Sequence, residues 1–243
     1  MFDYIFYTII VIFLIAYGAM PLLVYAQTKI PAFYNFIPVS EKEFLENSDE
    51  EFKSLFEEIG SNGFQYICSS SFTQQVTNTR FSVFSHPDKT ISISVIRITN
   101  PNVPSLLYLE VGQLFDDGTI IDVTNTSRSS VYPKSTTKVT FQFPDIKEVK
   151  ALIEVTESII SKYLSSKTPI TLPKGEEMQF IEKVINDEQL ELIAKGYFVK
   201  SADGDVCTVT LKGAYLMSWK LLWPIRQILE YKNRVYSKRL LEQ

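Results

Sequence analysis

Histidine and cysteine, which often carry out acid–base, nucleophilic or metal chemistry, are scarce in this sequence and are not grouped. His86 is the single histidine, and the two cysteines, Cys68 and Cys207, lie in different sequence contexts. A thiol beside an imidazole could act as a nucleophile–base pair, but nothing around His86 supports a pair with Cys68. The turn chemistry of Ser85–Asp88 instead predicts a solvent-exposed His86 in a hairpin turn. Two reduced, buried thiols are the expected state of the cysteines, and a disulfide between them is the alternative in an oxidising compartment.

Spaced catalytic and ligand-binding motifs are also missing. The sequence contains no GxSxG, GxGxxG or GxxxxGK[ST] segment, and no cluster of histidine and cysteine with zinc or iron spacing. Asp116, Asp117 and Asp122 are close together, but the first two fit a turn, and a calcium loop would need more oxygen ligands. We therefore expect no catalytic residue, no metal site and no cofactor. The alternative is an enzyme whose carboxylates and serines converge only in space.

The chain begins with an apolar stretch that would hold the rest of the protein at a membrane. Tyr4–Ala26 has no charged residue, and at about 1.5 Å per residue it can cross a hydrocarbon core about 30 Å thick. Aromatic residues near both ends favour a spanning helix. A cleaved signal peptide is the alternative, because Val24–Ala26 suits a signal peptidase. However, no Lys or Arg precedes the stretch, and it exceeds the roughly 7–15 apolar residues typical of a signal peptide. We therefore expect a transmembrane anchor at residues 1–27.

The segment from Gly213 to the C-terminus combines an apolar half that contains tryptophan with a basic half. From Lys212 onward there are seven basic and two acidic residues, whereas the whole chain has a net charge of −4. This pattern fits an interfacial helix on anionic lipid, and a terminal helix docked on its own domain is the alternative. The anionic inner leaflet would attract the basic half, so we expect a single-pass protein of the cell membrane with its domain in the cytoplasm. The candidate membrane contacts are Trp219, Trp223, Arg226, Lys232 and Arg234.

Residues 28–40 contain two prolines and predict a linker that leaves the membrane. Ser40 and Glu43 then form a capping box, which predicts the start of a helix. Apolar residues recur at helical spacing from there to Gly60.

From Phe64 the pattern changes to alternation of apolar and polar residues, which predicts about five half-buried strands. Turn residues separate these strands at 86–89, 100–102 and 116–118. Short turns favour antiparallel pairing, and residues 137–143 predict a further edge strand. Residues 41–144 therefore form a helix plus an antiparallel sheet.

Residues 145–243 predict helices and one hairpin. Asp145 is placed to cap a helix over 146–164, and a second amphipathic helix spans about 176–195. Asp203-Gly204 predicts a tight turn between two short strands before the C-terminal helix. The expected fold class is α+β, with a single N-terminal transmembrane helix followed by an antiparallel β-sheet packed with amphipathic helices. We expect residues 41–243 to be one compact unit.

Two parts of the sequence resemble known groups. The second amphipathic helix, the Asp203-Gly204 hairpin and Thr210–Gly213 resemble the recognition helix and wing of winged-helix regulators. That helix region carries six acidic residues, which phosphates would repel, so this resemblance implies a structural or protein-contact use. Residues 106–126 and 196–226 resemble a group of uncharacterised bacterial membrane-anchored proteins. This second resemblance implies the anchor and the α+β domain, and it supplies no catalytic residue.

The acidic body of the chain provides no basic face for nucleic acid. We therefore expect a membrane-tethered, non-enzymatic domain for protein interaction or complex organisation. Its expected partners are the lipid bilayer and another protein, with no nucleic acid. The alternatives are a lipid-surface-binding module and the enzyme with a dispersed site.

Overall fold

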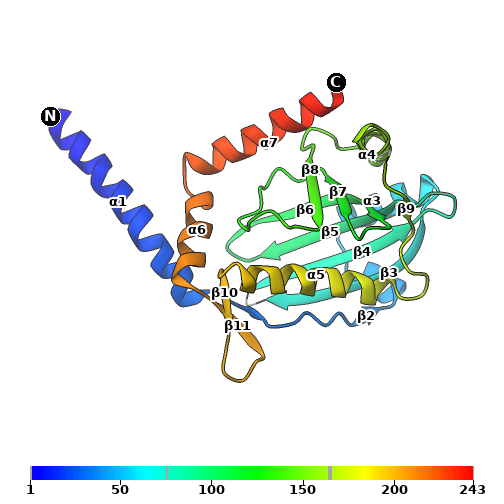
Figure 1. Cartoon of the computed structure of the whole chain (residues 1–243), viewed down its shortest axis with the longest axis horizontal. Coiled ribbons are helices and arrows are strands. Elements are labelled where there is room, and N and C mark those ends of the chain that lie inside the picture. The colour runs from blue at the N-terminus through cyan, green and yellow to red at the C-terminus, as the bar shows by residue number, and fades with distance from the viewer. Residues whose placement is uncertain (1, 75, 164–165, 243) are drawn as a thin grey trace. The chain divides into compact units, whose positions relative to one another are not determined.

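The computed structural model describes residues 2–74, 76–163 and 166–242, and its elements are labelled in chain order in Figure 1. The fold is mixed α+β, with 43% helix and 28% strand. The chain forms two compact units, and each is assembled from separated segments of the sequence. Unit 1 comprises Met1–Tyr34, Ser129–Pro133 and Asn186–Tyr231; unit 2 comprises Asn35–Arg128, Lys134–Ile185 and Lys232–Gln243. The sequence pattern predicts consecutive segments that end at residues 27, 40 and 144, whereas each observed unit combines segments that are separated in the sequence.

Unit 1 contains the N-terminal apolar helix and a small three-stranded antiparallel sheet. Helix α1 (Phe2–Gln27) is followed by β1 (Lys29–Pro31), and the sheet has the order β1-β11-β10. Strands β10 (Phe198–Lys200) and β11 (Val206–Val209) form the predicted hairpin, and the positive φ of 81° at Gly204 explains the glycine in its turn. Cys207 lies opposite Ile30 in the sheet, and both are buried in the core of this unit.

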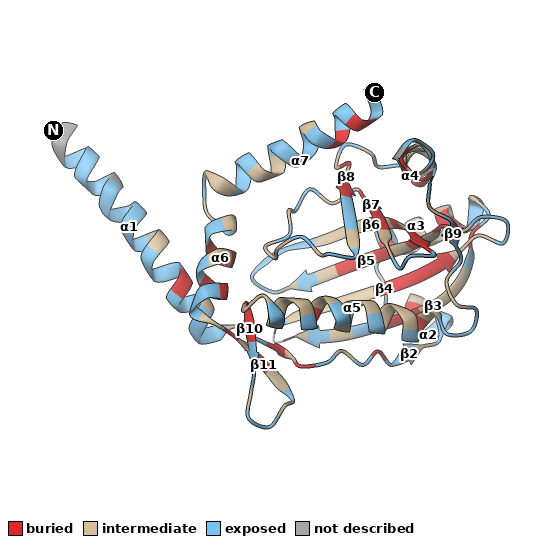
Figure 2. Ribbon diagram, in the orientation of Figure 1, coloured by how far each residue is buried: buried red, intermediate tan, exposed pale blue. Residues whose placement is uncertain are grey.

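Helix α1 is mostly exposed along its length, as Figure 2 shows. Within the described residues it is the one helix that is long and apolar enough to cross a bilayer, a property that signal sequences share. One side of its C-terminal half is different, because Tyr17 and Val24 are half-buried and Pro21 is buried. This side packs against α6 (Leu211–Leu221).

Unit 2 is built on an eight-stranded sheet in the order β2-β3-β4-β5-β6-β7-β8, with β9 paired to β6. The longest strand, β6, has 13 residues. The strands are β2 (Pro38–Val39), β3 (Gln65–Gln74), β4 (Thr77–Ser85), β5 (Ser92–Asn100), β6 (Val103–Phe115), β7 (Ile120–Thr124), β8 (Lys138–Gln142) and β9 (Pro169–Ile170).

One pair in this sheet departs from the predicted antiparallel arrangement. The predicted edge strand at 137–143 is present as β8, but it runs parallel to β7. The reason is the connection between them: residues 125–137 form a crossover of the length that parallel pairing requires, rather than a hairpin turn.

One face of the sheet is covered by α2 (Glu41–Glu46), α3 (Glu50–Ser61) and α4 (Val149–Tyr163). The Ser40 side chain accepts a hydrogen bond from the Glu43 backbone N–H at 3.4 Å, as half of the predicted capping box requires. The predicted cap at Asp145 is wrong. Helix α4 begins at Val149, whose backbone N–H donates to Glu58 at 2.9 Å, and Asp145 pairs with Lys238 at 3.1 Å.

The C-terminal segment is broken into two helices rather than one. Helix α6 ends at Leu221, and α7 (Ile225–Glu242) begins after a short connection. The last part of α7 belongs to unit 2, where Ser237 and Leu240 are buried and Ser237 Oγ accepts a hydrogen bond from the Gln142 backbone N–H at 3.2 Å. This part of the helix is therefore docked on the sheet domain.

Candidate functional site

The candidate site lies on the face of the unit 2 sheet that is turned away from α3 and α4. Side chains along a strand alternate between the two faces. On β5, Ile93 and Val95 enter the hydrophobic core, whereas Ser94 and Ile96 line a cavity on the opposite face. On β6, Leu109 enters the core and the side chains on either side of it line the cavity.

The cavity has a volume of about 360 Å³, which is within the range of roughly 300–1,000 Å³ for small-molecule sites. The first half of α5 (Glu177–Ala194) forms its other wall through apolar side chains one helical turn apart. Figure 1 shows this helix in front of the central strands. The apolar side chains that line the cavity are Phe72, Phe81, Val83, Ile96, Ile98, Leu114, Ile120, Leu172, Phe180, Ile181, Val184 and Ile185.

A polar patch on the sheet lies within this apolar surround. Glu110 on β6 is opposite Ser94 on β5, and Asp122 on β7 is opposite Gly112 on β6. A methyl group at Gly112 would meet Ser92 Oγ at 3.3 Å and Asp122 Oδ1 at 3.4 Å. The glycine therefore leaves room for the Asp122 carboxylate beside it.

The charges of this patch are two carboxylates and one ammonium group. Lys138 forms an ion pair with Asp122 Oδ2. Asp122 is only 6% exposed, so this ion pair is largely removed from water. With Glu110, the lining carries one more negative than positive charge.

Tyr108 adds a phenol to the same patch. Its burial, and secondarily the negative charge of Glu110, raise the pKa of this phenol above its ordinary value of 10.0. The hydroxyl therefore stays protonated at neutral pH and can donate or accept a hydrogen bond. The cavity thus combines an apolar body with acceptors and a neutral donor on one wall.

The sequence does not mark Tyr108, Glu110 or Lys138 as functional residues. It draws attention to Asp122 only because this residue is close to the two aspartates of a turn. Their convergence depends on the pairing of β6, β7 and β8, which no local motif encodes. One signal was present: Glu110 is a charged residue in the middle of an apolar strand, where a charge needs a specific environment.

The five predicted membrane contacts are divided between the two units. Trp219 and Trp223 lie in unit 1 and are 43% and 67% exposed. Arg226, also in unit 1, pairs with Glu230 at 2.9 Å. Lys232 and Arg234 belong to unit 2, where Arg234 lies 3.8 Å from Asp145. The structure therefore groups the two tryptophans with Arg226, and not with the more basic end of α7.

His86 and Cys68 do not form a nucleophile–base pair by any contact in the described chain. The His86 ring packs edge-on against the Phe64 ring, with 5.1 Å between the ring centres. Its Nδ1 atom accepts a hydrogen bond from the Asp88 backbone N–H at 3.1 Å. Burial, and then the charge of Glu177, raise the pKa of the Cys68 thiol to about 12. A thiol with so high a pKa is a poor nucleophile. Cys68 and Cys207 are both free thiols.

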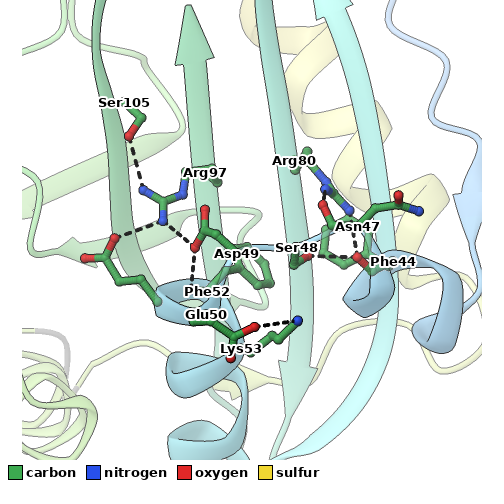
Figure 3. Close-up of polar contacts among 11 residues, drawn as sticks. Phe44, Asn47, Ser48, Asp49, Glu50, Phe52, Lys53, Arg80, Arg97 and Ser105 are labelled. Atoms are coloured by element: carbon green, nitrogen blue, oxygen red, sulfur yellow. Dashed lines mark hydrogen bonds and ion pairs between the residues drawn. The ribbon is translucent and has the colours of Figure 1, made fainter.

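A pair of arginines on the core face of the sheet has a structural role (Figure 3). Arg97 donates to Asp49 at 2.6 Å and to Glu51 at 2.9 Å. Arg80 lies 4.4 Å from the centre of the Phe44 ring and donates to the Phe44 carbonyl at 2.7 Å. Both arginines thus hold the start of α3 and the end of α2 on the sheet.

Comparison with known proteins adds no relative, because no family model, curated protein or solved structure matches this chain. Within the described residues no group of three or more His, Cys, Asp or Glu side chains is arranged to hold a metal ion.

Proposed function

We propose that this chain is a membrane-anchored binding module, and that the cavity between the unit 2 sheet and α5 is its ligand site. The observation that carries the proposal is the polar patch of Tyr108, Glu110, Asp122 and Lys138, which lines an otherwise apolar volume of about 360 Å³. The sequence favours a protein as the partner. The cavity favours a smaller ligand, because its volume of about 360 Å³ suits a small molecule rather than a protein segment with its backbone.

The ligand that fits this lining has an apolar body and one hydrogen-bond donor group that carries a positive charge. A carboxylate of the lining would accept a hydrogen bond from the ligand, and the excess negative charge of the lining favours a cation. The apolar walls would contribute about 25 cal/mol for each Å² of ligand surface removed from water.

The membrane part of the proposal rests on α1. Its length and composition suit a single span, and Lys29 follows its C-terminal end, whereas residues 1–3 include no Lys or Arg. The positive-inside rule then favours a cytoplasmic location for the domains. A single cysteine at Asp203, in a variant without Cys68 and Cys207, tests this orientation. Protection from an impermeant thiol reagent in intact cells is expected, and labelling of intact cells would contradict it.

The binding proposal is tested with three water-soluble probes that share a cyclohexyl ring: cyclohexylamine, cyclohexanol and cyclohexanecarboxylate. The full chain in lipid nanodiscs is examined by saturation-transfer NMR. The amine is expected to bind best and the carboxylate worst. Ser94→Phe, which fills the cavity, should abolish the signal, whereas Thr99→Phe on the same strand but outside the cavity lining should not. Equal signals in the two variants would overturn the cavity as the site.

A second candidate function is catalysis in the same cavity. Glu110, Asp122, Ser92 and Ser94 all line it, so carboxylates and serines converge there as the enzyme alternative requires. Turnover of p-nitrophenyl esters or glycosides that is lost in both Glu110→Gln and Asp122→Asn would favour this candidate. Binding without turnover would favour the binding module.

A further inference from the structure

The surface of α6 carries a stripe of large apolar side chains that is exposed in unit 1. Leu211, Tyr215 and Trp219 are 58%, 54% and 43% exposed. Their spacing of four residues places them on one side of the helix. Leu221 and Trp223, at the end of α6, are exposed as well. A stripe of this kind on a small unit needs a covering surface.

The two lysines of α6 do not point their charged groups into this apolar stripe. Lys220 donates to the Tyr132 carbonyl at 2.6 Å, and Lys212 donates to the Lys195 carbonyl at 2.8 Å. Both ammonium groups are therefore directed to the backbone of their own unit.

Helix α6 lies beside α1, and an aromatic contact joins the C-terminal end of α6 to α1. The Tyr17 ring is 5.5 Å from the Trp219 ring, and Tyr17 Oη donates to the Trp223 carbonyl at 2.7 Å. The donated bond satisfies a carbonyl in the connection after α6, where the helical hydrogen bonds stop. A carbonyl in contact with lipid has to be satisfied within the protein in this manner.

The position of Tyr17 along α1 determines how deep in the bilayer this contact lies. Tyr17 lies about 20 Å along the helix from Tyr4, at about 1.5 Å per residue. A hydrocarbon core is about 30 Å thick. If α1 spans the core from Tyr4, Tyr17 has not yet reached the opposite boundary. The end of α6, which Tyr17 contacts, must then lie at the lipid boundary or within it.

We infer that α6 is a second membrane-contacting helix, which lies against α1 and inserts Trp219, Leu221 and Trp223 into the lipid. With 11 residues, it is about 16 Å long and cannot span the bilayer. The anchor is thus a two-helix unit, with one helix that crosses and one that enters. The Arg226–Glu230 ion pair begins α7 at this level, and the long arginine side chain can extend to the headgroups. This inference rests on the membrane anchor of the proposed function and is independent of the cavity.

Trp219 and Trp223 are the chain's two tryptophans, so the tryptophan emission reports on this region alone. The full chain is reconstituted in phosphatidylcholine–phosphatidylglycerol vesicles whose acyl chains carry bromine. The expected result is a loss of most of the tryptophan emission, with protection from aqueous iodide. The single-tryptophan variants Trp219→Phe and Trp223→Phe should each show the same quenching.

A control tryptophan at Ala202, in the exposed β10–β11 turn, belongs in a variant without the other two and should be quenched by iodide. Quenching of Trp219 and Trp223 by iodide but not by bromine, in protein that floats with the vesicles, would overturn the inference. Protein that does not float with the vesicles would instead overturn the anchor itself.

Discussion

Arg80 and Arg97 lie directly opposite each other on β4 and β5, on the core face of the sheet. Two like charges in this position destabilise a sheet unless each is neutralised. Arg97 is 8% exposed and is neutralised by Asp49 and Glu51, whereas Arg80 donates to backbone carbonyls and lies over the Phe44 ring. Each arginine thus faces away from the other towards a different helix end.

The Arg97 cluster predicts an asymmetry between its two sides. Arg97→Met leaves Asp49 and Glu51 in water and should lower the free energy of unfolding by about 1–2 kcal/mol. The double variant Asp49→Ala with Glu51→Ala leaves a buried guanidinium without an ionic partner and should cost about 3–5 kcal/mol. Denaturant unfolding of the full chain checks both values. Lys53→Met, which breaks an exposed pair with Glu50, should change stability by less than about 1 kcal/mol. A larger loss for Arg97→Met than for the double variant would contradict this account.

The same cluster predicts a pH dependence. Although burial opposes ionisation, hydrogen bonds from the Phe52 backbone N–H and from Arg97 hold the pKa of Asp49 below its ordinary value of 3.8. A carboxyl whose pKa is lower in the folded state stabilises the fold above its unfolded pKa, and the stabilisation is lost as pH falls through its folded pKa. The difference in unfolding free energy between the unaltered protein and Asp49→Asn, which keeps a capping oxygen, should therefore shrink below about pH 4. A difference that stays constant down to acid unfolding would contradict the assignment.

Cys68 should react slowly with alkylating reagents. Its pKa of about 12, against an ordinary value of 9.0, lowers the thiolate fraction at pH 8 by a factor on the order of 10³. The rate of iodoacetamide modification in a Cys207→Ser variant, followed by mass spectrometry, measures this factor and should keep rising with pH beyond 9. Urea unfolding should restore the rate of an ordinary thiol. A rate that levels off near pH 9 in the folded protein would contradict the burial of this thiol.

Gly213→Ala should destabilise unit 1. A methyl group at this position would lie 2.8 Å from the Tyr197 carbonyl carbon. This distance is a steric clash, so the first turn of α6 would have to move. We expect a loss of about 1–3 kcal/mol or more, measured by thermal unfolding with tryptophan emission as the signal. Gly18→Ala in α1 meets no atom within 4 Å and is the matched control. Equal stability of the two variants would show that α6 can shift freely.

Local signals in the sequence predicted local structure well. The Asp203-Gly204 turn and the Ser40 cap depend on neighbouring residues, and both are present. Asp145 failed as a cap because the helix begins only at Val149, whose backbone N–H donates to Glu58, a residue distant in the sequence. The parallel partner of β8 and the cavity patch depend on strand order, which alternation alone does not specify. The fold class could therefore be predicted in outline, while the site required the three-dimensional pairing of β6, β7 and β8.

The interleaving of the two units has a consequence for protein synthesis. Tyr17 and Trp223, which are joined by a hydrogen bond, are separated by 206 positions, so α1 leaves the ribosome long before its partner helix exists. During that interval the side of α1 that later packs against α6 has to be covered by lipid, by the insertion machinery or by a chaperone. A truncated chain that stops before α6 would keep this side open permanently, and quality-control proteases that recognise unpaired helices would be expected to remove it.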